Sequence, residues 1–186
     1  NFPWLSSINV EFGMIPVLAI RVAYTGELGW ELHHPVEFQN QFLNMILHHG
    51  KNYDLKLVGA RAQNWLRQEK SYRAFGNELG RDASLDEAGL AKFINMKKEF
   101  LGKKGILSRK SETKCVTLII DGPKDCDPWG REAIYKDGQV VGRLTSGGYS
   151  VVFRKSIGMG YLKKEVANLG EKIEIKMLNK LWPAKI

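Results

Sequence analysis

Hydrophobic positions in the first part of the chain follow a strand pattern and then two helical patterns. A β-branched, mostly apolar run at residues 17–23 stops at Tyr24-Thr25-Gly26, which predicts a strand followed by a turn. Apolar residues then recur at helical spacing until Gly50, a typical helix-ending residue; they are Phe38, Phe42, Met45 and Ile46. A second helical pattern covers residues 58–69. The first part therefore predicts strand, helix, helix.

Beyond residue 110 the pattern changes to short β-rich runs separated by turns. The runs cover residues 115–121, 131–136, 139–144, 149–153, 157–162 and 172–178. Asp137-Gly138 lies between two of them and is a strong signal for a two-residue hairpin. The pattern predicts a small antiparallel barrel or sandwich. Most of its aromatic residues are expected in the core, which is favoured over a base-stacking platform. The expected fold class is α+β, with domains at residues 1–110 and 111–186.

Composition and charge narrow the class of protein. The 186 residues include 28 Lys+Arg and 20 Asp+Glu, for a net charge of +8, and residues 1–110 and 111–186 each carry +4. This even spread favours solvated surface over a nucleic-acid stripe. No apolar stretch approaches the roughly 18 residues that cross a bilayer, so no membrane partner is expected. Cys115 and Cys126 cannot build a disulfide scaffold or a four-ligand zinc site, which favours a reduced, intracellular protein.

The densest candidate site is the segment Tyr-Thr-Gly-Glu-Leu-Gly-Trp-Glu-Leu at residues 24–32. Glycines permit a tight turn, so that neighbouring aromatic and acidic side chains can converge on a flat ligand. The Glu31 carboxylate could accept two parallel hydrogen bonds from a 2-amino-pyrimidinone, the chemistry of a pterin or guanine ring. The alternative is a turn with a buried Trp30 and two solvated glutamates, and spacing alone favours that alternative.

Other candidate constellations are weaker. The histidines occur as neighbouring pairs, which point to different faces of an element, so no metal site is expected. No nucleophile, base and orienting group is visible, and no catalytic residue is assigned. Residues 66–70, Leu-Arg-Gln-Glu-Lys, could form a buried polar network or exposed ion pairs, of which exposed pairs are commoner. Residues 84–87, Ser-Leu-Asp-Glu, have capping-box form, although Gly89 weakens a helix there.

Several motifs, read in order, resemble one family. They are Tyr-Thr-Gly-Glu-Leu-Gly-Trp-Glu-Leu (24–32), Leu-Arg-Gln-Glu-Lys-Ser-Tyr-Arg-Ala-Phe-Gly (66–76), Leu-Asp-Glu-Ala-Gly-Leu (85–90), Glu-Phe-Leu-Gly-Lys (99–103), Asp-Gly-Gln-Val-Val-Gly (137–142), Thr-Ser-Gly-Gly-Tyr-Ser (145–150) and Gly-Met-Gly-Tyr (158–161). The set resembles the tetrahydrofolate-binding aminomethyltransferases: the T-protein of the glycine cleavage system and the folate domains of dimethylglycine and sarcosine dehydrogenases. The resemblance covers nearly the whole chain and corresponds to the carboxy-terminal half of the module.

The resemblance implies a tetrahydrofolate site in which Tyr24 and Glu31 hold the pterin. In the T-protein branch an Arg on the following helix also contacts folate, and alignment places Gln63 there. A neutral amide cannot replace that charged contact, which puts glycine cleavage in doubt. The dimethylglycine dehydrogenase branch is more similar to this sequence. The family's catalytic Asp lies in the amino-terminal half of the module, which this chain does not include.

The function implied by the resemblance is tetrahydrofolate-dependent one-carbon (aminomethyl) transfer, in glycine, sarcosine or dimethylglycine catabolism, forming 5,10-methylene-tetrahydrofolate. The expected partners are folate, a small amine substrate, the other half of the module and a flavin domain in the parent chain. The expected location is bacterial cytoplasm or mitochondrial matrix. The alternatives are a folate-binding scaffold of the tRNA-modification type and a non-catalytic fragment. The first alternative is weakened because neither cysteine stands in that branch's Lys-Gly-Cys-Tyr-type segment.

Overall fold

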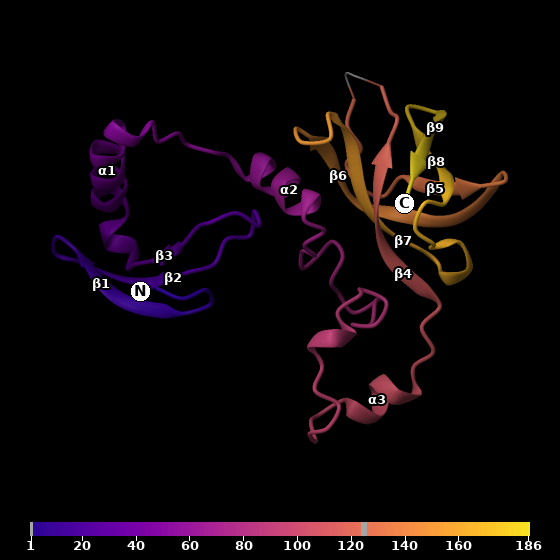
Figure 1. Ribbon diagram of the computed structural model, residues 1–186, viewed down its shortest axis with the longest axis horizontal. Helices are drawn as coiled ribbons and strands as arrows, with labels where there is room; N and C mark the ends of the chain where they lie inside the picture. The colour runs from indigo at the N-terminus through magenta and orange to yellow at the C-terminus, as the bar shows by residue number, and fades with distance from the viewer. Residues whose placement is uncertain (1, 124–125) are drawn as a thin grey trace. The chain divides into compact units, whose positions relative to one another are not determined.

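A computed structural model describes residues 2–123 and 126–186, which fall into two compact units, Asn1–Gln63 and Asn64–Ile186. The first unit has a three-stranded antiparallel sheet of order β1-β2-β3 and one long helix (Figure 1). Its elements are β1 (Ser7–Phe12), β2 (Ile15–Ile20), β3 (Glu31–His33), the 3-10 helix η1 (Val36–Phe38), α1 (Gln39–Gly50) and the 3-10 helix η2 (Lys51–Tyr53).

One face of this sheet carries the core of the first unit. Ile15 and Val17 of β2 alternate with exposed residues, and they pack against Phe42 of α1. Leu32 of β3 packs against the same cluster. Because side chains alternate along a strand, the neighbours of these residues point to the opposite face. In this unit α1 therefore covers one face of the sheet, and the other face is open.

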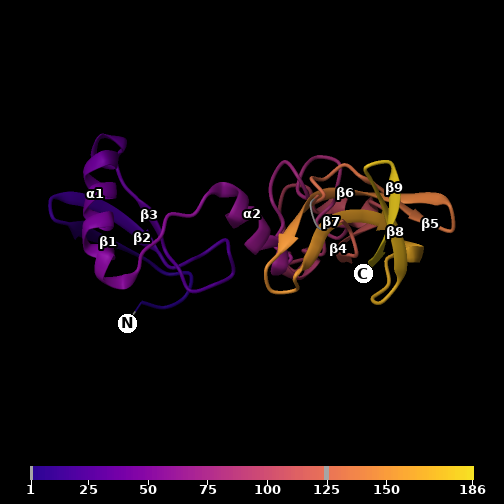
Figure 2. The same cartoon turned by 90° about the horizontal axis from the view of Figure 1, so that it is seen from above.

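The second unit contains a closed antiparallel barrel of order β4-β7-β6-β5-β8-β9 (Figures 1 and 2). Its strands are β4 (Thr113–Ile120), β5 (Ala133–Lys136), β6 (Gln139–Ser150), β7 (Lys155–Lys163), β8 (Lys172–Met177) and β9 (Lys180–Lys185). The α-helix α2 (Ala60–Glu69) precedes the barrel in the chain, together with η3 (Ala91–Phe93) and α3 (Lys103–Ser108); η4 (Lys164–Val166) follows β7. The structure confirms the expected α+β class with a small antiparallel barrel.

The barrel core is aliphatic. Alternate residues of β4, Val116, Leu118 and Ile120, point inward with Leu144, Leu162 and other branched side chains. The prediction that most aromatic residues of this segment lie in the core is wrong. Trp129 is 78% exposed and Phe153 49% exposed, and of the six aromatic residues at 111–186, all of which the structure describes, only the partly buried Trp182 packs against the core cluster. A six-stranded barrel has a narrow interior, which branched aliphatic side chains fill at native density.

The hairpin predicted at Asp137-Gly138 is present. Lys136 pairs with Gln139, and both central residues have positive φ, 50° and 74°. Positive φ at both positions is the geometry of a type I′ turn, which Asp-Gly favours. One other expectation needs correction, because the runs at 139–144 and 149–153 form one strand, β6, which ends at Ser150. Strands β1, β3 and β9 have no counterpart among the predicted runs.

Gly160 of β7 provides a test of barrel packing. A Cβ at Gly160 would contact the Arg143 carbonyl oxygen of β6, which belongs to backbone and cannot rotate away. We expect Gly160→Ala to lower the free energy of unfolding by about 1–3 kcal/mol. The control is Gly105→Ala in α3, where nothing lies within 4 Å of the new methyl group; it should be neutral or stabilising by up to about 1 kcal/mol. Urea unfolding measures both, and equal values would contradict the packing argument.

Candidate functional site

The three sequence-predicted site residues lie on separate elements of the first unit. Glu31 is the first residue of β3, Tyr24 lies half-buried in the segment between β2 and β3, and Gln63 is exposed on α2. Their convergence on one ligand stays a prediction. The segment that holds Tyr24 depends on glycine: Gly26 has a φ of 74°, and a Cβ at Gly29 would lie 2.8 Å from the Ala23 Cβ. The glycines of the motif are thus required by the turn itself.

Glu31 stands on the open face of the sheet. It pairs with Ile20 of β2, and His33 pairs with Leu18, so these four side chains share the face opposite α1. Leu18 is 38% exposed, and the Glu31 side chain is 50% exposed. The His33 Nε2 atom lies 3.2 Å from Glu31 Oε2. A carboxylate with apolar neighbours on an accessible sheet face suits a flat ligand that has paired N–H donors.

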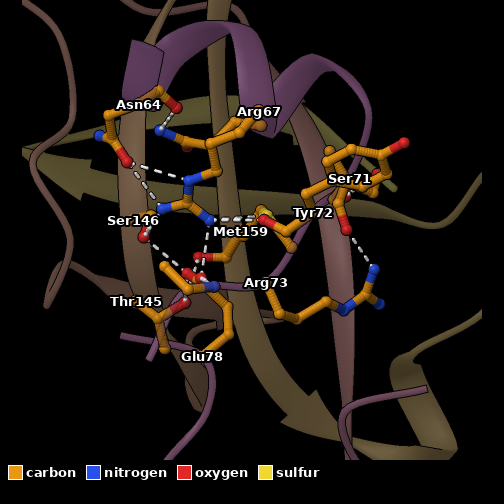
Figure 3. A network of polar contacts seen from close by, with 12 residues as sticks. Asn64, Arg67, Ser71, Tyr72, Arg73, Glu78, Thr145, Ser146 and Met159 are labelled. Atoms are coloured by element: carbon orange, nitrogen blue, oxygen red, sulfur yellow. Dashed lines mark hydrogen bonds and ion pairs between the residues drawn. The ribbon is translucent and has the colours of Figure 1, made fainter. Parts of the chain in front are cut away.

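The second unit contains a buried network of polar residues around Arg67 of α2 (Figure 3). Arg67 and Glu78 both have fully buried side chains, and the Arg67 Nη1 atom lies 2.7 Å from Glu78 Oε2. Nη1 also donates to the Tyr72 carbonyl oxygen at 2.8 Å. Nε and Nη2 donate to Asn64 Oδ1, at 2.9 and 2.8 Å, and Nη2 donates to Ser146 Oγ at 2.7 Å. The donors of the guanidinium are therefore satisfied within the protein.

A β-bulge explains how two consecutive residues of β6 reach the same carboxylate. The register of β6 against β7 shifts between Leu144 and Ser146. In a regular strand neighbouring side chains point to opposite faces, whereas a bulge redirects one of them. The hydroxyls of Thr145 and Ser146 both donate to Glu78 Oε1, at 2.7 and 2.6 Å. The Thr-Ser-Gly-Gly motif at residues 145–148 is thus a part of the barrel that contacts α2.

The charge of Glu78 is stabilised inside the protein. Burial by itself raises the pKa of this carboxyl, but hydrogen bonds from Ser146, Thr145 and the Ala74 N–H, together with the Arg67 charge, outweigh burial, so the pKa lies below its usual value. Sequence reasoning left residues 66–70 open between a buried network and exposed pairs, and for Arg67 the structure shows the buried one. Glu78 itself was not predicted, because its hydroxyl donors are more than 60 residues away in the chain.

A third polar cluster surrounds Glu87. The capping-box bonds are present: the Ser84 N–H donates to Glu87 Oε2 at 2.9 Å, and the Glu87 N–H donates to Ser84 Oγ at 3.1 Å. A turn follows instead of a helix. Glu87 also accepts bonds from Arg109 Nη2 at 3.0 Å and Thr113 Oγ1 at 3.0 Å. Burial raises the pKa of Glu87, but the hydrogen bonds from Ser84 and Thr113 outweigh it and lower the pKa to about 2.

Metal-binding clusters and membrane-spanning helices are both absent from the described part of the chain. Within residues 2–123 and 126–186, no group of three or more His, Cys, Asp or Glu side chains could hold a metal ion. In the same described part of the chain, no helix is long and apolar enough to cross a membrane. Burial raises the pKa of Cys115 to about 11, which makes this thiol a poor nucleophile.

Comparison with known proteins identifies the family. Residues 1–98 match the GCVT N-terminal domain, and residues 114–186 match the glycine cleavage T-protein C-terminal barrel domain. The chain therefore belongs to the glycine cleavage T-protein family. The crystal structure of aminomethyltransferase T from Bartonella henselae has the same fold, with a TM-score of 0.85 at 20% identity, over 98% of this chain and 51% of that one.

Two kinds of curated relatives are similar in sequence. Mitochondrial dimethylglycine dehydrogenase of Homo sapiens is 38% identical over all of this chain, which covers 22% of that protein. The aminomethyltransferase of Caldanaerobacter subterraneus subsp. tengcongensis is 34% identical over 96% of this chain and 48% of that protein. The chain thus spans about half the length of the aminomethyltransferase and about a fifth of the dehydrogenase.

Removing one partner of the buried ion pair should strongly lower the free energy of unfolding of the second unit. Arg67→Met leaves Glu78 as an uncompensated buried carboxylate, and we expect a loss of about 3–5 kcal/mol in the free energy of unfolding. The double variant with Glu78→Gln should lose less than the sum of the single variants. As control, Glu99→Gln removes an exposed i,i+4 pair with Lys103 and should cost about 0.5 kcal/mol or less. A similar loss in both would contradict the role of the buried pair.

The Glu87 cluster should make stability pH-dependent in the acid range. Because its pKa is lowered from 4.5 to about 2 on folding, its stabilisation is complete above about pH 4.5 and is lost as the pH falls toward about 2. In Glu87→Gln the unfolding free energy should therefore fall less steeply over this window than in the wild type. Denaturant unfolding at a series of pH values measures the slope. An unchanged slope would exclude Glu87 as its source.

Proposed function

We propose that this chain forms the tetrahydrofolate-binding part of a one-carbon transfer module, with its domains at residues 1–110 and 111–186. The observation that supports this most directly is the position of Glu31, a half-exposed carboxylate on an open, partly apolar sheet face. Its two oxygens match the ring N–H and exocyclic amine of a reduced pterin, which is a bidentate donor pair. The family to which the chain belongs is one of aminomethyltransferases and related proteins.

In this proposal each predicted site residue has its own task. Glu31 fixes the orientation of the pterin through two hydrogen bonds, and the Tyr24 ring covers part of its face. Gln63 supplies a neutral amide, which can orient the ligand but gives no charge-assisted contact. Apolar neighbours of Glu31, Leu18 and Ile20, reduce the contact of the bound ring with water.

Tetrahydrofolate, when bound, supplies the nitrogen atoms that accept a one-carbon unit, giving 5,10-methylene-tetrahydrofolate. The one-carbon donor in the proposal is a small amine, and the similarity to dimethylglycine dehydrogenase favours an N-methylated glycine over glycine itself. No residue of this chain is assigned as catalytic. The remainder of the module and a flavin domain are the proposed partners in the parent protein, with the mitochondrial matrix or bacterial cytoplasm as the location.

Titration with 5-formyl-tetrahydrofolate tests the role of Glu31. Glu31→Gln keeps the shape of the side chain but replaces one acceptor oxygen with a donor group, so it loses a charge-assisted pair. We expect binding to weaken roughly ten- to a hundredfold, as measured by isothermal titration calorimetry.

The matched control is Glu37→Gln, an exposed glutamate in η1, which should bind as the wild type does. Equal affinity in Glu31→Gln and wild type would refute the assignment of Glu31. Absence of binding by the wild-type protein would refute the folate proposal as a whole.

A further inference from the structure

Arg131 has a backbone conformation that disfavours its own residue type. Its φ is 77°, in the left-handed region where glycine and asparagine are much better tolerated. Such a conformation costs stability and persists only where the surroundings enforce it. An arginine at this position is therefore not explained by the turn.

The surroundings of Arg131 do enforce its conformation. The N–H groups of Trp129 and Gly130 donate to the two carboxylate oxygens of Glu132, each at 2.8 Å. The Arg131 N–H donates to the Leu144 carbonyl oxygen at 2.7 Å, and the Leu144 N–H donates to the Glu132 carbonyl oxygen at 2.9 Å. These two backbone hydrogen bonds to Leu144 of β6 fix Arg131 beside the strand that carries Arg143.

Both arginines line one cavity of about 410 Å³ on the outside of the barrel. Its lining also includes most of the segment 76–83 and Tyr161, which pairs with Arg143 across β6 and β7. The Tyr161 hydroxyl donates to the Glu78 carbonyl oxygen at 2.7 Å, which fastens the segment over the strands. A cavity of this volume accommodates a small organic ligand.

The charges that face the cavity leave a positive surplus. Glu78 also lines it, but the buried Arg67 already balances that carboxylate. Asp82 lies 4.0 Å from Arg143 Nη2, the outer limit of an ion pair, and both side chains are largely exposed. Among the residues that the structure describes, no carboxylate is recorded within ion-pair distance of the Arg131 guanidinium. Of the two acidic residues that line the cavity, only Asp82 is therefore left to offset the charges of Arg131 and Arg143.

We propose that Arg131 and Arg143 form a binding site for a small oxyanion, a carboxylate or phosphate group on a ligand that fits this cavity. Guanidinium groups present parallel N–H donors that match both kinds of oxyanion bidentately. The site consists of residues of the second unit only and shares none with the proposed folate site, and it does not depend on that function. Asp82 competes for Arg143 and sets the affinity.

Calorimetric titration of the protein with inorganic phosphate and, separately, with succinate tests this site. We expect saturable binding of at least one probe, and the probe that binds more tightly identifies the ligand as a phosphate or a carboxylate. Arg143→Gln should weaken binding about tenfold or more, and Asp82→Asn should strengthen it. The control Lys176→Gln changes an exposed lysine of β8 that does not line the cavity and should have no effect.

Arg131→Asn separates a binding role from a structural one. Asparagine tolerates positive φ, so this variant should have a thermal midpoint equal to or above that of the wild type. Its affinity for the probe should nevertheless fall about tenfold or more. Wild-type affinity in Arg131→Asn, or no binding of either probe by the wild-type protein at millimolar concentration, would overturn the proposal.

Discussion

The ion pair between Arg67 and Glu78 is the interaction on which the second unit depends. Both side chains have no solvent exposure, so neither charge can be hydrated, and each must be satisfied within the protein. The partners that do this come from α2, from the segment after it and from the bulge of β6. One buried charge pair thus fixes the end of a helix to the wall of a barrel.

Polar anchoring extends to the whole segment between α2 and β4. Of the buried apolar residues among those the structure describes, this segment contributes only Ala88, whereas Phe75, Phe93 and Leu101 are more than 70% exposed. Its position is set instead by Glu78 and Glu87, each of which accepts hydrogen bonds from distant strands. Hydrogen bonds are directional and form only where donor and acceptor are aligned, so a segment held in this way has a defined path without a hydrophobic core of its own.

The two units present different chemistry. The first unit offers an accessible sheet face on which Glu31 stands among apolar neighbours, and the proposed pterin site depends on that face. The second unit binds its own charges internally and leaves two arginines around a cavity. The match of residues 1–98 to the GCVT N-terminal domain establishes the family, while the arginine site rests on side chains of this chain alone.

Local sequence determined the helices α1 and α2, most barrel strands and the hairpin at Asp137-Gly138, because periodicity and turn preference act over a few residues. Ordered motifs also identified the family. Tertiary structure decided what local patterns cannot encode. The burial of Arg67 depends on Thr145 and Ser146, which reach the same carboxylate because of a bulge in β6. The exposure of Trp129 follows from the narrow interior of the barrel, which aliphatic side chains fill. The pairing of Glu78 with residues far along the chain arises only when the barrel closes, which is why sequence reasoning could name Glu31 but not Glu78.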